Sequence, residues 1–548
     1  MNELVLKIKN VVKELFDVDV TPEVTPAPKN TGADFSSNVA MKLAGMLKQN
    51  PRQVAEQLAG KFDDITVEIA GPGFLNFTLS DKYFAGKIDD LVRDFDGNVA
   101  NDAFSGKTVI CEFSDPNPFK VLHVGHLYTS IVGDSIARLF EYAGAKVVRA
   151  NFGGDVGLHV GKTMWALLKS GAKDFTIEDI AAKYVEGTQA YEDDEAARQE
   201  IVAINKQVYE IAEKDLHGSE LAEVYWKGRE LSYQYFEDFY RRIGVKFDKY
   251  YPESTVAGRG LTEVKKGLEQ GVYEMSDGAV VYRGDEKLGL HTRVFINKEG
   301  LPTYEAKDVG LIYTKWDDYH FDKSVVITGN DIIDYMRIVL ASVGEMNPEL
   351  PERTTHLTHG QVKLQGSVKM SSRKGNFLKA VDVLNLITEE LKNEYNSEDE
   401  KIVLGATKYA FLKYKMGGDI IFDPKESVKM TGNSGPYLLY ASLRAKKVLE
   451  KVTVKSGNWQ ENFAETEKNL IKKIVQYRDV LAEAVNEMAP HKICAYLYEL
   501  AQEFSRFYEN CPVVGDECEY GRAKITAAYA KTMLHGLNIL GIEVPKEM

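Results

Sequence analysis

Residues 107–151 read KTVICEFSDPNPFKVLHVGHLYTSIVGDSIARLFEYAGAKVVRAN. The apolar run at 108–113 predicts a buried strand. From about residue 127 to residue 142, apolar side chains recur at helical spacing until Gly144 ends the pattern. Residues 146–151 predict a second strand. A strand, a helix and a strand in this order form a βαβ unit, whose two strands run parallel in one sheet.

A second group of elements lies further along the chain. Residues 324–328 and 355–359 predict two more strands, each with a helical stretch before it. The intervening sequence is mostly helical and highly charged, so residues 162–293 are interpreted as an insertion between two halves of one nucleotide-binding sheet. We therefore expect an α/β fold with a Rossmann-type parallel sheet at residues 106–378.

Smaller domains are expected on both sides of this sheet. Residues 1–105 contain an amphipathic helix, a Pro-rich loop, a helical segment at 35–58 and two alternating runs around Gly71-Pro-Gly73. These features predict a small N-terminal α/β domain. Within residues 379–548 helical periodicity dominates, which predicts a C-terminal all-α helical bundle.

The composition excludes several classes of protein. Of the 548 residues, 44% are hydrophobic and 27% are charged, and no run reaches the roughly 20 apolar residues of a membrane helix. The start of the chain does not resemble a signal peptide, and the four cysteines contain no CxxC pair, so we expect a cytoplasmic protein. No histidine or cysteine cluster has metal-ligand spacing, so no protein-bound metal is predicted. The net charge of −14 argues against nucleic-acid binding by bulk charge, so any such contact must be local.

The first chemical motif is HVGH, which lies where the first strand runs into its helix. Ligands bind at such edges of parallel sheets, and two imidazoles at a helix N-terminus can both reach a phosphate chain. Gly125, between the histidines, lets a flat base approach the backbone. Taken alone, His123 and His126 also fit half of a zinc site or ordinary polar residues at a helix start.

The second motif is VKMSSRKGN at residues 368–376, after the last predicted strand. Lys369, Arg373 and Lys374 can place positive charge on a triphosphate, and the hydroxyls of Ser371 and Ser372 can donate hydrogen bonds to it. A solvated basic loop is the alternative. The occurrence of both motifs in this order in one chain favours an ATP site.

This pair of motifs resembles the HIGH and KMSKS motifs of class I aminoacyl-tRNA synthetases. The stretches EFSDPNPFKVLHVGHL, GADFSSNVAMKLA, GPGFLNF, SGPYLLYASLRA and GLNILGIEVPKEM further resemble arginyl-tRNA synthetases, and together they span all three predicted domains. The resemblance implies a ligase that activates L-arginine with ATP and Mg²⁺ and transfers it to the 3′ end of tRNA(Arg). Its implied partners are tRNA(Arg), L-arginine and ATP, without a membrane, and we expect a monomer.

The resemblance also assigns residues to the catalytic site. The implied catalytic and ATP-binding set is His123, Gly125, His126, Lys120, Lys369, Met370, Ser371, Ser372 and Arg373. Ser372 replaces the second lysine of KMSKS, and Lys120, just before HVGH, is expected to supply that cation, with Arg373 and Lys374 as alternatives. The implied arginine-binding set is Glu112, Asn117, Tyr304 and Asp308. A guanidinium group pairs best with carboxylates, which agrees with this set.

The flanking domains are implied to contact tRNA. Phe74 and Asn76 are expected to read the tRNA elbow, although Phe74 also fits the core of an ordinary strand. Tyr437, Tyr440, Arg444 and Met548 are expected to contact the anticodon. Two competing functions stay open: a class I synthetase for another amino acid, which should lack the arginine-binding set, and a catalytically silent tRNA-binding relative.

Overall fold

The central feature of the fold is a parallel sheet. The structure, a computed structural model, describes residues 2–28, 31–62, 65–285, 287, 289–365 and 378–548. Within these residues the sheet has five parallel strands in the order β12-β11-β5-β6-β7. They are β5 (Thr108–Glu112), β6 (Lys146–Gly153), β7 (Lys249–Pro252), β11 (Lys323–Gly329) and β12 (Thr354–His359). The chain extends the sheet from β5 first to one side and then to the other, so the carboxyl end of β5 lies at the topological switch point where ligands bind.

Helices pack around the sheet, and one of them carries HVGH. They are α6 (Val124–Tyr142), α11 (Glu253–Glu269), α12 (Tyr304–Tyr319), α13 (Ile333–Met346) and α14 (Glu349–Arg353), with a 3₁₀ turn η3 (Asn330–Ile332). Helix α6 begins three residues earlier than its apolar periodicity predicts. The reason is a cap: Nδ1 of His123 accepts the backbone N–H of Gly125 at 3.1 Å, so HVGH itself forms the helix start.

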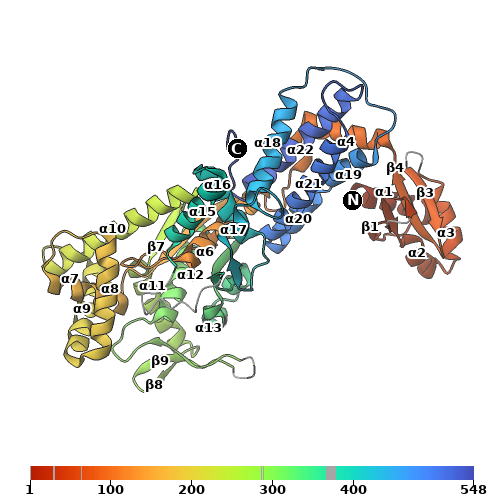
Figure 1. Cartoon of the computed structure of the whole chain (residues 1–548). Coiled ribbons are helices and arrows are strands. Elements are labelled where there is room, and N and C mark those ends of the chain that lie inside the picture. The colour runs from red at the N-terminus through yellow and green to blue at the C-terminus, as the bar shows by residue number, and fades with distance from the viewer. Residues whose placement is uncertain (1, 29–30, 63–64, 286, 288, 366–377) are drawn as a thin grey trace.

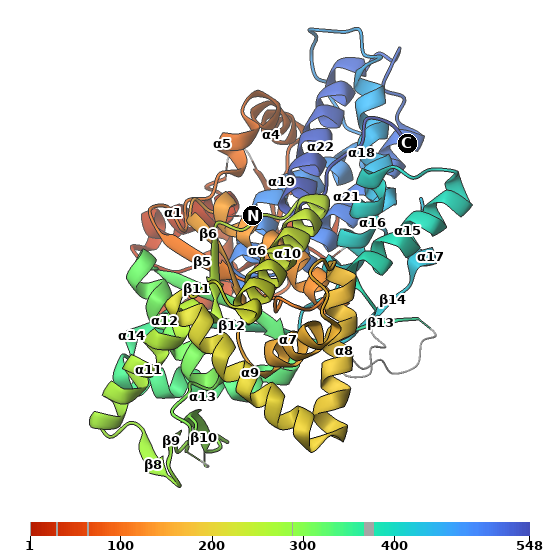
Figure 2. The same cartoon turned by 90° about the vertical axis from the view of Figure 1, so that its left-hand side faces the viewer.

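A helical insertion follows β6 and forms one end of the molecule (Figure 1), the end that faces the viewer in Figure 2. It comprises α7 (Leu158–Ser170), α8 (Ile177–Asp193), α9 (Glu195–Lys214) and α10 (Glu220–Ile243). The expected insertion at 162–293 was too long, because β7 lies inside that range and pairs in parallel with β6 of the main sheet. A small antiparallel sheet, which the sequence analysis did not predict, contains β8 (Glu274–Ser276), β9 (Ala279–Tyr282) and β10 (Arg293–Ile296).

The N-terminal domain lies at the opposite end of the molecule (Figure 1). It contains α1 (Asn2–Phe16), β1 (Val24–Pro26), β2 (Phe35–Ser37), α2 (Val39–Leu47), α3 (Pro51–Ala59), β3 (Ile65–Ala70) and β4 (Phe74–Leu79). The predicted β3–β4 hairpin is present, with Gly71 at a φ of +53° in its turn. The segment 35–58 is not one helical stretch: it begins with β2 and breaks at Asn50, which caps α3 ahead of Pro51.

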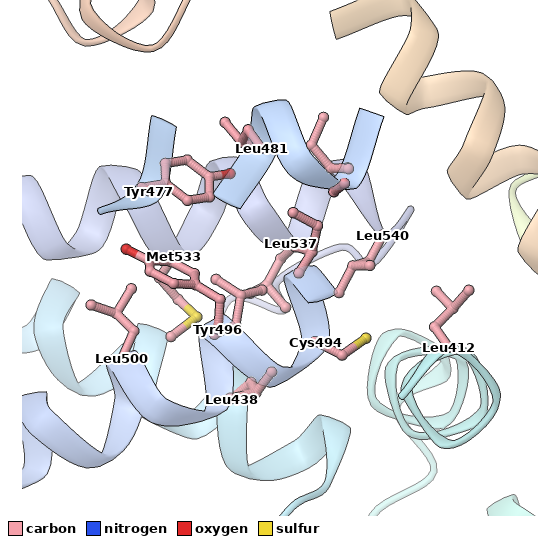
Figure 3. Packing of buried hydrophobic residues seen from close by; sticks show 14 of the residues in the cluster. Leu412, Leu438, Tyr477, Leu481, Cys494, Tyr496, Leu500, Met533, Leu537 and Leu540 are labelled. Carbon is pink, nitrogen blue, oxygen red and sulfur yellow. The ribbon is translucent and has the colours of Figure 1, made fainter. Parts of the chain in front are cut away.

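The C-terminal region is the expected helical bundle. Its helices are α15 (Ala380–Tyr395), α16 (Glu400–Leu412), α17 (Pro424–Ser427), α18 (Gly435–Leu449), α19 (Glu465–Val475), α20 (Tyr477–Glu487), α21 (Pro490–Asn510) and α22 (Glu519–Ile539). Figure 3 shows their shared core, in which Leu438, Tyr496 and Leu537 converge from different helices. The periodicity at 470–488 is divided between α19 and α20, which meet at Gln476.

The bundle contacts both of the other domains. Helix α6 packs against α15, α16, α20, α21 and α22. Helix α4 (Asp81–Arg93), which precedes α5 (Phe95–Val99), packs against α19 and α22. A two-stranded pair, β13 (Val362–Leu364) and β14 (Ile420–Phe422), connects the end of the sheet region to the bundle. In the described part of the chain, no helix is both long enough and apolar enough to cross a membrane.

Candidate active site and RNA-contacting surfaces

The two sequence motifs are brought together at their flanks. The chain leaves the described residues after β13 and returns at Leu378, whose carbonyl accepts the backbone N–H of Val124 at 2.9 Å. Ala380 N–H in turn donates to the carbonyl of Leu122 at 2.9 Å. The segment that contains the second motif therefore ends beside HVGH. The predicted residues Lys369, Met370, Ser371, Ser372 and Arg373 lie outside the described residues.

The two histidines of HVGH form one hydrogen-bonding unit. Their rings stack with centroids 3.8 Å apart. Nδ1 of His123 accepts from Gly125, and Nδ1 of His126 accepts the backbone N–H of His123 at 3.1 Å. Because Nδ1 is the acceptor in each ring, the neutral tautomer carries its proton on Nε2. Each histidine therefore holds an Nε2–H donor at the N-terminus of α6, where anions bind.

Both imidazoles are neutral in this environment. Burial, reinforced by the nearby Lys120 and His359, lowers the pKa of His123 to about 4. Burial and the adjacent His123 also lower the pKa of His126 well below its usual range. The histidines thus offer hydrogen bonds but no charge, so the positive charge for a phosphate chain must come from another group. Lys120 acts electrostatically on both histidines and forms no ion pair with any described residue, which makes it available for that role.

The loop between β5 and α6 has an unusual backbone. Ser114, Asp115 and Phe119 all adopt positive φ angles, of 74°, 49° and 67°. Non-glycine residues in this region are strained, and such strain concentrates at functional sites. Asn117, in the same loop, accepts the backbone N–H of Gly154 through Oδ1 at 2.8 Å. A Cβ at Gly154 would lie only 2.7 Å from that oxygen, so glycine is required for this approach.

The predicted arginine-binding carboxylates lie at the switch point with different partners. Glu112, at the end of β5, is buried and pairs with Lys315 of α12 at 2.5 Å. Asp308, one turn into α12, is 9% exposed and accepts the hydroxyl of Tyr335. Tyr304 is the first residue of α12 and is 56% exposed.

A second buried ion pair borders the same site. Glu253, at the start of α11, lies 2.6 Å from Lys307, and both side chains are buried. The ammonium of Lys307 also lies 5.1 Å from the ring centroid of Tyr304 and 5.2 Å from that of Tyr209. The sequence analysis missed Glu253, Lys307 and Lys315. The sequence offers one sign of such a pair, since Lys307 and Asp308 are adjacent charged residues in a buried stretch of α12.

After these pairings, two further acidic side chains of the site remain without a cation. Neither Asp308 nor Asp115 forms an ion pair within the described residues. Burial, with Glu112 and Glu253 nearby, raises the pKa of Asp308 to about 7. Burial and Glu112 also raise the pKa of Asp115 well above its usual range. A cation placed beside these carboxyls would lower both pKa values, because an opposite charge favours the ionised carboxylate.

The predicted elbow-reading pair differs in exposure. Phe74, at the start of β4, is 40% exposed. Asn76 lies on the same face of β4 but is only 5% exposed, between Ser36 of β2 and Glu68 of β3. The aromatic ring of this predicted pair therefore reaches solvent, whereas the amide of Asn76 is covered by the neighbouring strands. Phe74 can offer a ring face for stacking, as base recognition requires.

The predicted anticodon residues gather around a hollow in the bundle. Tyr440, Arg444 and Met548 line a pocket of about 710 Å³. The guanidinium of Arg444 lies 4.7 Å from the ring centroid of Tyr440 and 5.2 Å from that of Tyr508, a residue the sequence analysis missed. Tyr437 does not line this pocket; it is half-buried, with its hydroxyl 3.4 Å from Ser505 Oγ. Exposed tyrosines beside arginine are suited to binding unstacked bases.

Three regions of the chain match known protein families. Residues 91–423 match the family described as "tRNA synthetases class I (R), catalytic domain". Residues 438–548 match the "DALR anticodon binding domain", and residues 2–79 match the "Arginyl tRNA synthetase N terminal domain". No three His, Cys, Asp or Glu side chains in the described ranges are grouped to hold a metal ion.

Individual relatives agree with this assignment over their whole length. The chain is 29% identical to the arginine–tRNA ligase of Fusobacterium nucleatum, over 96% of this chain and 95% of that protein. It is 28% identical to the enzyme of Treponema denticola, over 96% and 94%. The solved Thermus thermophilus arginyl-tRNA synthetase has the same fold, with a TM-score of 0.80, 22% identity and complete coverage of both chains. The chain belongs to the arginyl-tRNA synthetase family of class I (R) tRNA synthetases.

Proposed function

We propose that the site at the carboxyl end of β5 is where this arginyl-tRNA synthetase activates L-arginine for transfer to tRNA(Arg). In the first step, a carboxylate oxygen of arginine attacks the α-phosphorus of ATP and pyrophosphate leaves. In the second step, a hydroxyl of the terminal ribose attacks the activated carbonyl and AMP leaves. The substrate supplies both nucleophiles, so the protein contributes positioning and charge stabilisation.

The observation that carries the choice of arginine is the charge balance of the pocket. Lys315 and Lys307 neutralise Glu112 and Glu253, which leaves Asp308 and Asp115 without a cation among the described residues. A guanidinium ligand supplies the missing positive charge and can donate to a carboxylate in forked geometry. An uncharged or acidic amino acid would leave these carboxyls buried and unpaired. We assign Asp308 to the guanidinium group.

The remaining predicted arginine contacts have supporting roles in this proposal. Oδ1 of Asn117 accepts the backbone N–H of Gly154, so we assign the two N–H groups of its side-chain amide to donate to the ligand. Tyr304 is exposed and lies one helical turn before Asp308, so its ring is assigned to cover the bound ligand. Glu112 acts on the ligand mainly through its field, since Lys315 already pairs with it.

The phosphates of ATP are assigned to the N-terminus of α6. His123 and His126 donate Nε2–H hydrogen bonds there, and Lys120 supplies charge that neutral imidazoles lack. Gly125 leaves room at the backbone, and the KMSSR segment, Lys369 included, completes the site. Mg²⁺ arrives on ATP and screens its charge.

The other domains are proposed to bind tRNA(Arg). Phe74 stacks on a base of the elbow, and the hollow around Tyr440, Arg444 and Met548 receives anticodon bases. Tyr437, on the same helix as Tyr440, and Asn76, on the same strand as Phe74, are proposed to support these RNA contacts from less exposed positions. We expect a monomer that acts in the cytoplasm.

The test is aminoacylation of total cellular tRNA with each labelled amino acid in turn. We expect charging with arginine alone, loss of that charging in Asp308→Ala, and a fall of about a hundredfold in kcat for Lys120→Met. Lys162→Met is the matched control, because Lys162 also lies over a tyrosine ring in the insertion but is assigned no role at the phosphates. Charging with another amino acid would favour another specificity, and tRNA binding without any charging would favour a silent relative.

A further inference from the structure

The helical insertion holds the residue before Lys120. The side chain of Phe119 is fully buried, and it belongs to the hydrophobic core of the insertion with Val160, Phe175 and Tyr225. Its ring stacks on Tyr225 of α10, with centroids 5.8 Å apart. The loop from β5 to HVGH is therefore anchored in the insertion and not only in the sheet domain.

Helix α10 also fixes the backbone at this point. The N–H of Phe119 donates to Ser232 Oγ at 2.9 Å, inside the protein. Gly228, one turn earlier on α10, leaves the space that the Phe119 ring occupies, since a Cβ there would lie 2.7 Å from Cε1 of the ring. These contacts hold Phe119 at its positive φ angle of 67°. The direction in which the next side chain leaves the backbone is thereby set.

The insertion reaches the side chain of Lys120 as well. The Lys120 ammonium lies over the ring of Tyr184 of α8, 4.8 Å from its centroid, and both residues are half-buried. No described acidic group pairs with Lys120, so the ring face is the contact that restrains its four flexible torsions. A cation over an aromatic face is stabilised without losing its charge. The ammonium therefore stays available for a phosphate.

We propose that the insertion positions the cation of the ATP site from two sides, with Phe119 and Tyr184 as positioning residues for Lys120. This inference rests on the proposed role of Lys120 at the phosphates. It gives the inserted helices a catalytic purpose, because an ordered cation contributes more to transition-state stabilisation than one that samples many rotamers.

The first test compares two substitutions of one ring. Tyr184→Leu removes the aromatic face, and we expect kcat for arginine charging to fall about three- to thirtyfold with little change in the KM for tRNA(Arg). Tyr184→Phe keeps the face and should recover most of that loss. Tyr191→Leu on the same helix is the matched control, since Tyr191 carries the unrelated Lys162, 4.6 Å away. A Phe variant as impaired as the Leu variant would overturn the proposal.

A double-mutant cycle separates positioning from general damage. In a Lys120→Met background, Tyr184→Leu should cost nothing further, because the group it positions is gone. An equal additional loss in that background would overturn the proposal. If Lys120→Met itself keeps full activity, the assigned role of Lys120 fails, and this inference fails with it. If Lys120→Met is impaired and Tyr184→Leu is not, the positioning role alone is overturned.

Gly228→Ala tests the second part of the proposal, the anchoring of Phe119 against α10. The new methyl group must displace Phe119, so we expect a fall in kcat with tRNA(Arg) binding retained. Gly258→Ala is the matched control, because Gly258 lies in the interior of helix α11 with no atom near the added Cβ. Unchanged kcat in a folded Gly228→Ala protein would contradict the anchoring through Phe119.

Discussion

Replacing Asp308 with asparagine should make the protein more stable while it abolishes arginine binding. Asparagine has nearly the same shape, and its side-chain oxygen can still accept the hydroxyl of Tyr335. It cannot ionise, however. Burial raises the pKa of Asp308 from 3.8 to about 7, so its ionised form is costly in the folded protein.

The size and the pH window of this cost follow from the shift. A rise from 3.8 to about 7 corresponds to on the order of 4 kcal/mol. The unfolded chain ionises this carboxyl from about pH 4, whereas the folded chain does so only near pH 7. The unfolding free energy of the wild type therefore falls as pH rises through this window, and the full cost is present above it. The stability gained by Asp308→Asn should be about 2 to 3 kcal/mol larger at pH 8 than at pH 5.

Urea denaturation of both proteins at the two pH values measures this difference. Asp317→Asn is the matched control, because Asp317 is half exposed on the same helix and pairs with Arg259 on the surface, where such pairs contribute less than about 1 kcal/mol. For the wild type, the KM for arginine should rise about tenfold from pH 8 to pH 6 as Asp308 becomes protonated. An equal stability gain at both pH values would refute the reasoning, because it would mean that Asp308 is not desolvated.

Other substitutions test the remaining contacts. Lys315→Met leaves Glu112 buried without its partner and should lower the unfolding free energy by about 3 to 5 kcal/mol in denaturant titrations. Adding Glu112→Gln should restore part of this loss. An unchanged unfolding free energy in Lys315→Met would mean that water reaches Glu112. Arg444→Ala should raise the KM for tRNA(Arg) transcripts about tenfold and leave kcat unchanged, whereas an unchanged KM would remove the hollow from the RNA-binding surface. Gly133→Ala places a Cβ 2.1 Å from Cγ of Phe113, so thermal denaturation should begin several degrees lower, and an unchanged midpoint would show that the ring can move aside.

The sequence predicts the fold well where a pattern is long and local. The βαβ unit around HVGH and the helical C-terminal bundle are confirmed, because hydrophobic periodicity reports burial over many residues. Short elements were missed for the same reason. Strand β7 has four residues, and neither its length nor its composition distinguishes it from the surrounding insertion; only its pairing with β6 does so.

The candidate site is predictable only in part. HVGH is visible in the sequence as a local motif, whereas Tyr304 and Asp308 were assigned only through the family resemblance. The partners of the site residues are not visible in the sequence, because Lys315 is 203 positions from Glu112 and meets it through the packing of α12 on β5. Tyr184 was missed for a similar reason, because the lysine that lies over its ring, Lys120, is in the loop before α6, far from Tyr184 in the sequence. Burial of Asn76 also depends on both neighbouring strands, which local alternation does not reveal.

The stability cost at Asp308 is an argument for its function. A chain selected only for stability would place a neutral side chain there, since burial of an unpaired carboxyl lowers the unfolding free energy. The neighbouring acids Glu112 and Glu253 each have a lysine, which shows that this fold can supply internal partners. In the proposed function, the charge that Asp308 lacks among the described residues is supplied by a cationic ligand. Because the missing partner is a cation, the guanidinium group of arginine fits this proposal, whereas an uncharged amino acid would leave the Asp308 carboxyl buried and without a cation.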